Sequence, residues 1–134
     1  MTPDNGRVYD DNNVFARILR GEIPARKVYE DEYVLAFDDI RPQAPVHILV
    51  VPKGRYLSFD DFARDASDHE IAAFTRAIGR IAETAGVAAT GYRLIFNHGP
   101  HSHQEVPHLH AHIIGGRALG GLVPSTAGVA IKGP

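Results

Sequence analysis

The stretch 108-HLHAHIIGG-116 places a histidine at every second position and then continues into two isoleucines and two glycines. Alternate residues of a β-strand point to the same face of the sheet, about 6.6 Å apart along the strand. The sequence therefore predicts a strand over residues 108–114 with one polar and one apolar face. We expect the imidazoles of His108, His110 and His112 on the outer face. The inner face then carries Leu109, Ala111 and Ile113, which we expect in the core.

Four more segments have the β-branched and aromatic composition that is typical of strands. The first two flank an acidic turn at residues 30–32, and the last precedes the polar loop 98-HGPHSHQE-105. Pro107 fits the start of the histidine-rich strand, where a missing N–H does no harm. The predicted strands are 27-KVYED-31, 33-YVLAFDD-39, 46-VHILVV-51 and 92-YRLIFN-97.

Two segments have helical periodicity. In 12–25, Asn12 or Asn13 supplies an N-cap, Gly21 ends the helix, and the expected apolar stripe is Val14, Phe15, Ile18 and Leu19. In 67–86, Ser67 and Glu70 form a capping box, Gly86 ends the helix, and the expected buried face is Ile71, Phe74, Ile78 and Ile81. The sequence thus predicts one short and one long helix.

Strands that surround a helix, without regular βαβ alternation, predict an α+β fold. We expect a mainly antiparallel sheet of about five strands in one domain spanning residues 1–134. Residues 1–11 and about 118–134 are rich in polar residues or in glycine and alanine, so we expect irregular tails there.

Composition excludes several classes of protein. The net charge is −2, so no global basic field favours nucleic acid or an acidic membrane. The chain has no cysteine, which rules out disulfides and thiolate metal sites. The N-terminus lacks a basic and apolar leader, and no apolar run approaches the roughly 20 residues of a membrane span. We therefore expect a cytoplasmic protein without a nucleic-acid or membrane partner.

Three imidazoles on one face suit two kinds of chemistry. Neutral imidazoles bind zinc, and three of them leave one open position for catalysis. Alternatively, an imidazole nitrogen attacks phosphorus and forms a nucleotidyl-histidine. A histidine-rich surface strand without a chemical role is the third interpretation.

The metal interpretation has a geometric difficulty. Three histidines on a straight strand spread over about 13 Å, whereas zinc holds its nitrogen ligands at about 2.1 Å. One ion could bind two of them and take a further ligand from His98, His101 or His103 in the loop. We keep this as an alternative and expect neither a metal nor another cofactor.

The segment 108-HLHAHII-114 resembles the His-φ-His-φ-His-φ-φ pattern of the histidine triad (HIT) superfamily, where φ is a hydrophobic residue. The segments 35-LAFDDIRPQAPVHILVVPK-53 and 92-YRLIFNHGPHSHQEVPHLHAHIIGG-116 match further family elements in order and spacing. The resemblance covers about Val14 to Arg117 and is strongest to the Hint branch of nucleoside phosphoramidases.

The resemblance implies a role for each histidine. His110 matches the nucleophile, which attacks the α-phosphorus of a nucleotide conjugate. His112 matches the ligand of a phosphate oxygen, and His108 matches the member that orients and tunes the nucleophile. His47 matches a histidine behind the triad, and a core histidine satisfied by the backbone is an equally good interpretation of it.

The resemblance also implies substrate-binding residues. Asn97 matches a phosphate-placing residue, Gln104 lies toward the leaving group, and Asp39 matches the carboxylate that binds the ribose hydroxyls. Glu105 replaces a hydroxyl residue of eukaryotic relatives, so it either turns outward or contacts a leaving-group amine. The loop 101-HSH-103 replaces small residues and so reshapes this side. The apolar slot for the base matches Phe15, Ile18, Phe37, Ile40 and Leu49.

These matches predict a hydrolase of purine nucleoside 5′-monophosphate conjugates, such as an amine linked to AMP, acting through a nucleotidyl intermediate on His110. Hydrolysis of dinucleoside polyphosphates is one alternative, and nucleotide binding without turnover is another. The family further implies a homodimer in which the long helix and the strand after it meet across the two-fold axis.

Overall fold

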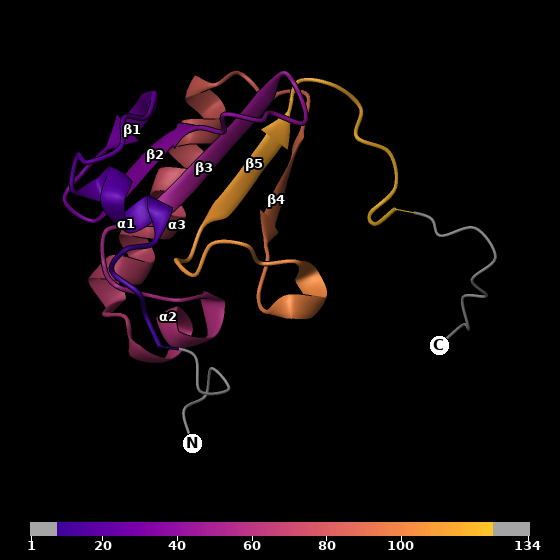
Figure 1. Ribbon diagram of the computed structural model, residues 1–134. Coiled ribbons are helices and arrows are strands. Elements are labelled where there is room, and N and C mark those ends of the chain that lie inside the picture. The colour runs from indigo at the N-terminus through magenta and orange to yellow at the C-terminus, as the bar shows by residue number, and fades with distance from the viewer. Residues whose placement is uncertain (1–7, 125–134) are drawn as a thin grey trace.

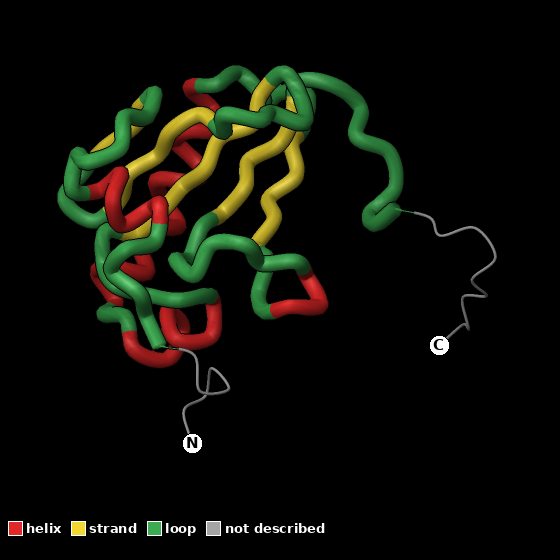
Figure 2. The backbone as a smooth tube through the Cα atoms, viewed as in Figure 1, coloured by secondary structure: helices red, strands yellow, loops and turns green. Residues whose placement is uncertain are grey.

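The computed structural model describes residues 8–124 of the chain. Five strands form one sheet in the order β1-β2-β3-β5-β4, and every neighbouring pair is antiparallel. Figure 2 shows this single sheet in yellow. The predicted α+β fold with five antiparallel strands is confirmed. The strands are β1 (Lys27–Glu30), β2 (Val34–Asp38), β3 (Val46–Pro52), β4 (Tyr92–Phe96) and β5 (Ala111–Gly115).

The long helix α3 (Asp68–Thr84) lies behind the sheet in Figure 1 and covers one face of it. Its capping box is present as predicted, because Glu70 N–H donates to Ser67 Oγ at 3.1 Å and Ser67 N–H donates to Glu70 Oε1 at 3.0 Å. Ile71 is only partly buried, whereas the rest of the predicted apolar face is buried. Between helix and sheet lies the larger core, which includes Val34, Ala36, Ile48, Val50, Phe74, Ile78, Ile81, Ala111 and Ile113.

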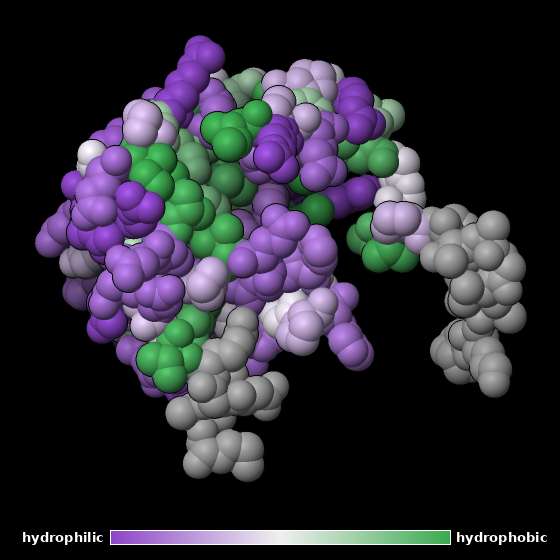
Figure 3. All heavy atoms as spheres, viewed as in Figure 1, coloured by the Kyte–Doolittle hydropathy of each residue, from purple (hydrophilic) through white to green (hydrophobic). Residues whose placement is uncertain are grey.

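The opposite face of the sheet is partly covered by the short helix α1 (Val14–Leu19). Asn13 caps it, because its Oδ1 accepts from Ala16 N–H at 2.9 Å. Val14 was predicted in the apolar stripe but is exposed, and Ala16 is buried instead. The smaller core formed here contains Phe15, Ile18, Leu35, Phe37, Leu49 and Val51. Figure 3 shows apolar side chains gathered on this face, bordered by polar ones.

Two short helical segments were not predicted. The first is α2 (Phe59–Asp65), and the second is the 3₁₀ helix η1 (Pro100–Ser102) within the predicted polar loop. The start of α2 is fixed by Asp61, whose carboxylate accepts from Leu57 N–H and Ser58 N–H, both at 2.8 Å. Short length and mixed polarity hide both segments from a periodicity argument.

Residues 8–11 have no helix or strand, but their side chains contact the rest of the protein. Asp11 forms a bidentate ion pair with Arg55, at 2.8 Å and 3.1 Å, and Tyr9 reaches the histidines. Residues 118–124 have no helix or strand, as expected. Residues 1–7 and 125–134 lie outside the described part, so one domain over residues 1–134 stays a prediction. Among residues 8–124, no helix is long and apolar enough to cross a membrane.

Candidate active site

The histidine-rich segment differs from its prediction in two ways. Strand β5 begins only at Ala111, so His108 and His110 precede it, and Leu109 N–H donates to Tyr56 O at 2.8 Å. The imidazoles were expected outside, but His108 is fully buried and His110 is only 7% exposed. Tyr9 and Phe15 contact these rings from the N-terminal side and contribute to that burial. The predicted burial of Leu109, Ala111 and Ile113 is confirmed.

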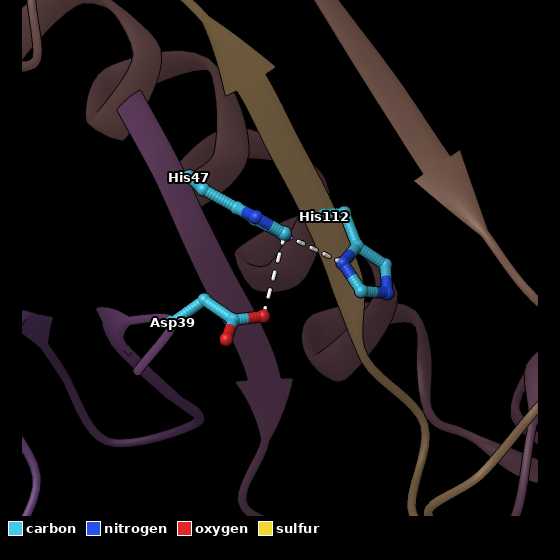
Figure 4. Close-up of side chains that lie close together, drawn as sticks. All are labelled: Asp39, His47 and His112. Atoms are coloured by element: carbon cyan, nitrogen blue, oxygen red, sulfur yellow. Dashed lines mark hydrogen bonds and ion pairs between the residues drawn. The ribbon is translucent and has the colours of Figure 1, made fainter. Parts of the chain in front are cut away.

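His112 on β5 contacts His47 on the adjacent strand β3. The register pairs Leu49 with His112 and His47 with Ile114, so the two histidines are diagonal neighbours on one face of the sheet. His47 Nε2 lies 3.0 Å from His112 Nδ1 and 3.4 Å from Asp39 Oδ2. Figure 4 shows His47 between the other two side chains.

Backbone contacts assign the protons of this pair. Gln43 N–H donates to His47 Nδ1 at 3.1 Å, so a neutral His47 carries its proton on Nε2. That N–H then donates to His112 Nδ1, which leaves the proton of His112 on Nε2. His112 Nε2 is buried and has no hydrogen-bond partner among residues 8–124. The Nε2–H of His112 is therefore a hydrogen-bond donor without an acceptor among residues 8–124.

His108 is held at both ring nitrogens. Its Nε2–H donates to Pro52 O at 2.8 Å, because a carbonyl only accepts. Its Nδ1 must then accept from the Tyr9 hydroxyl, which lies 2.5 Å away. Burial disfavours the imidazolium and lowers the pKa of His108 to about 4. His108 is therefore neutral at pH 7.

His110 is oriented by the backbone of the same segment. Its Nδ1–H donates to His108 O at 2.8 Å, which leaves a lone pair on Nε2. Burial lowers the pKa of His110 as well, so the ring is a free base at neutral pH. The ring centroids of His110 and His112 are 5.1 Å apart. The site thus combines an unprotonated imidazole nitrogen with a neighbouring N–H donor.

Four of the five residues predicted for the apolar slot lie together beside His110. Phe15, Ile18, Phe37 and Leu49 share the smaller core, and the centroid of the Phe15 ring is 4.9 Å from that of His110. Ile40 does not join them, because it is 91% exposed. It follows the turn at Asp39, whose carboxylate accepts from Arg41 N–H at 2.8 Å.

Asp39 and Ile40 instead line a cleft next to the histidines. The cleft has a volume of about 380 Å³, and its wall also includes Arg26, Asp38, Pro42, Pro45 and His47. The predicted ribose-binding carboxylate therefore lies at the edge of a cavity that reaches His47.

Comparison with known proteins identifies the family of this chain. Residues 20–119 match the HIT domain family. The chain belongs to that family. It is 57% identical over 117 residues to an uncharacterized 13.2 kDa HIT-like protein of Azospirillum brasilense, covering 87% of this chain and 96% of that protein. It is 43% identical over 112 residues to a purine nucleoside phosphoramidase of Escherichia coli K12, covering 82% and 92% of the two chains.

A solved structure gives the same result for the fold of this HIT protein. The crystal structure of a HIT family hydrolase from Legionella pneumophila superposes with a TM-score of 0.75 at 42% identity. The match covers 80% of this chain and 95% of the other. The predicted membership of the histidine triad superfamily is confirmed.

The loop before the triad is anchored by Gln104. Its amide nitrogen donates to Leu57 O at 2.8 Å and to Val106 O at 3.1 Å, and its Oε1 accepts from Gly99 N–H at 3.0 Å. These bonds fix the loop, and a contact of Gln104 with the leaving group stays a prediction.

Asn97 and Glu105 are the other two polar residues that were predicted to bind the substrate. Asn97 follows β4 directly, and the pairing of Phe96 with Ala111 puts it at the His110 end of the sheet. Glu105 is exposed and forms an ion pair with His103 at 2.8 Å, as expected if it turns outward. Their roles in substrate binding stay predictions.

The loop histidines do not form a metal site with the triad in the described part of the chain. His98 pairs with Asp60 at 3.3 Å, and among residues 8–124 the cluster suited to an ion is Asp39, His47 and His112. A metal on His47 Nε2 would require a proton on Nδ1, where Gln43 N–H already donates. Metal-bound histidines normally donate from the second nitrogen to an acceptor. The bonding of His47 favours a role in the hydrogen bond to His112 over a role as a metal ligand.

Sequence reasoning missed Tyr9, Gln43 and Pro52, which fix the histidine tautomers. Gln43 and Pro52 act through their backbones, and no side-chain pattern signals them. Tyr9 was detectable as an isolated aromatic residue within the polar segment 1–13.

Proposed function

We propose that this HIT protein is a hydrolase that cleaves the P–N bond of purine nucleoside 5′-phosphoramidates. The observation that carries the proposal is the bonding of His110, whose Nδ1–H is held by His108 O while Nε2 keeps its lone pair. A buried neutral imidazole of this kind is a nucleophile at pH 7. The name of the Escherichia coli relative, purine nucleoside phosphoramidase, supports the class of substrate.

The reaction has two displacements at phosphorus. His110 Nε2 attacks the α-phosphorus, the P–N bond to the amine breaks, and the amine nitrogen leaves with the electron pair and takes a proton from water. A second water then attacks the nucleotidyl-histidine. It breaks the bond between phosphorus and Nε2 and releases the nucleoside monophosphate and the free imidazole, and the proton that this water loses neutralises the hydroxide left by the first step. His112 Nε2–H donates to a non-bridging phosphate oxygen as negative charge develops there.

Two neighbouring features support a nucleoside as the bound group. The apolar cluster with Phe15 lies against His110 and suits a purine base. The Asp39 carboxylate at the edge of the cleft suits the ribose hydroxyls. Both features lie on the face of the sheet that carries His47 and His112, because Leu49 of the apolar cluster pairs with His112 and Asp39 lies beside His47.

The leaving group distinguishes this proposal from its main alternative. Steady-state hydrolysis is measured with an adenosine 5′-phosphoramidate and with a diadenosine polyphosphate, with and without a chelator. We expect faster turnover of the phosphoramidate, insensitive to the chelator. Preference for the polyphosphate would favour the dinucleoside hydrolase, and binding of AMP without turnover of either compound would leave a nucleotide-binding protein.

We also propose a homodimer across α3 and β4. Strand β4 is an edge of the sheet, and Leu94 on it is 42% exposed. An apolar groove of about 310 Å³ adjoins it, lined by Phe59, Phe62, Ala63, Ile71, Phe74, Thr75, Ile78, Leu94 and Phe96. An exposed apolar groove beside an unpaired strand edge favours a second copy of the chain. The cytoplasmic location stays a prediction.

A further inference from the structure

Within the described part of the N-terminal segment, the side chain of Tyr9 reaches the triad. Its hydroxyl lies 2.5 Å from His108 Nδ1, and the ring centroids are 5.6 Å apart at 63°. Because His108 Nε2–H is committed to Pro52 O, the Tyr9 O–H must be the donor in this contact. We propose that Tyr9 is a positioning residue for the nucleophile, and that the N-terminal segment is thereby part of the active site. This inference rests on the proposed function.

A clasp formed by Arg55 and Asp11 holds Tyr9 in place. The Arg55 guanidinium lies 5.0 Å from the centroid of the Tyr9 ring and binds both carboxylate oxygens of Asp11 at 2.8 Å and 3.1 Å. Arg20 donates to Asp11 O at 2.8 Å from the end of α1. A planar guanidinium that binds a carboxylate with two parallel bonds fixes orientation as well as distance. These contacts connect the segment that carries Tyr9 to Arg55 and to the end of α1.

The effect of Tyr9 reaches His110 in two steps. The Tyr9 hydroxyl and Pro52 O bind opposite nitrogens of the His108 ring, so they hold its plane and its tautomer. The carbonyl of the same residue, His108, accepts from His110 Nδ1–H at 2.8 Å. Movement of His108 would therefore disturb the bond that keeps the lone pair on His110 Nε2. Tyr9 has no contact with the reacting nitrogen, so it acts through His108.

The charge state of His108 depends on the same hydrogen bond. The Tyr9 O–H binds a lone pair that only the neutral ring has on Nδ1, so it stabilises neutral His108. Burial raises the pKa of the Tyr9 hydroxyl, which keeps it a donor at neutral pH. The other groups that act on the ring are Pro52 O from β3, Asp61 from α2, and His110. Loss of the Tyr9 hydroxyl removes a contribution that opposes protonation.

The direct test is Tyr9→Phe, which removes the hydroxyl and keeps the ring. We expect kcat to fall about tenfold with KM little changed, the size of one lost hydrogen bond. The matched control is Tyr29→Phe. Tyr29 lies on β1, outside the site, and its hydroxyl donates a comparable hydrogen bond to Asp31 at 2.6 Å. Arg55→Lys is the second variant; it keeps the charge, loses the bidentate bond, and should lower kcat about threefold. Arg55→Lys carries the test if Tyr9→Phe does not fold.

A spectroscopic measurement separates this inference from the proposed function. The ¹⁵N shifts of the His108 ring are measured in the ligand-free protein across pH 4–8. We expect the Nε2–H tautomer in the wild type, and a changed Nδ1 shift with a higher pKa of His108 in Tyr9→Phe. This result would support the positioning role even if the wild type did not turn over a phosphoramidate. Unchanged His108 signals, or an equal loss of kcat in Tyr29→Phe, would overturn it.

Discussion

The four histidines of the site are set by hydrogen bonds that each assign one proton. His47 accepts from Gln43 N–H, His108 donates to Pro52 O, and His110 donates to His108 O. His47 and His112 lie in strands, whereas His108 and His110 precede β5. The alternation of histidines along a strand therefore does not by itself place the four rings. Three backbone groups fix what the side chains can do chemically.

Removal of His47 tests whether it fixes the tautomer of His112. In His47→Ala, His112 Nδ1 loses its donor and the proton of His112 is no longer fixed on Nε2. We expect kcat for phosphoramidate hydrolysis to fall about tenfold or more, because His112 then presents the correct donor only part of the time. Steady-state kinetics measure this, with His69→Ala on the exposed start of α3 as the control. Equal kcat in the two variants would contradict a role of His47 in fixing the tautomer of His112.

Burial of His108 makes stability depend on pH. Its pKa is about 4 in the folded protein and about 6.5 in an unfolded chain, so between these values the unfolded chain binds more protons. The contribution is fully present above pH 6.5 and is lost as the pH falls toward 4. By pH 5 the loss is on the order of 2 kcal/mol in the free energy of unfolding.

Urea unfolding at pH 7 and pH 5 measures this loss for the wild type and for His108→Gln. Glutamine does not titrate, so the difference between the two pH values should shrink by about that amount in the variant. An identical difference in both proteins would show that His108 is not the titrating group.

At the scale of elements, the capping box of α3 should stabilise the fold without affecting the site. Ser67→Ala removes the acceptor of Glu70 N–H. We expect the free energy of unfolding to fall by about 1 kcal/mol, measured by urea unfolding, while kcat stays at the wild-type value. A matching fall in kcat would mean that α3 influences the site on the other face of the sheet.

The elements also show what the sequence could predict. The capping box, Asn13 and Gly21 could be predicted because they are local signals. The long helix and strands β2 to β4 could be predicted because their apolar residues recur with helical or strand periodicity and form the core. The histidine alternation predicted exposed imidazoles, and this was wrong because the alternation carries no information on what covers a strand. His108 is buried by Tyr9, which is 99 residues away in the sequence. Ile40 lies apart from the apolar cluster for a related reason, because a turn fixed by Asp39 leaves it exposed.

At the scale of the whole molecule, the proposed dimer depends on the β4 edge. Leu94→Asp places a charge in the apolar groove and should convert the dimer to a monomer, measured by sedimentation. The matched control is Val28→Asp on β1 at the other edge of the sheet, since Val28 is also 42% exposed. Dissociation by Val28→Asp and not by Leu94→Asp would place the interface at the β1 edge and contradict the proposed dimer.

During turnover, His110 Nε2 should become covalently bound to a nucleotide. The most direct measurement mixes the protein with an adenosine 5′-phosphoramidate, quenches it within milliseconds to seconds, and records the intact mass and the modified peptide. We predict a transient adduct of one AMP on His110 in the wild type, and no adduct and no turnover in His110→Ala. Turnover by His110→Ala, or an adduct on another residue, would contradict the account.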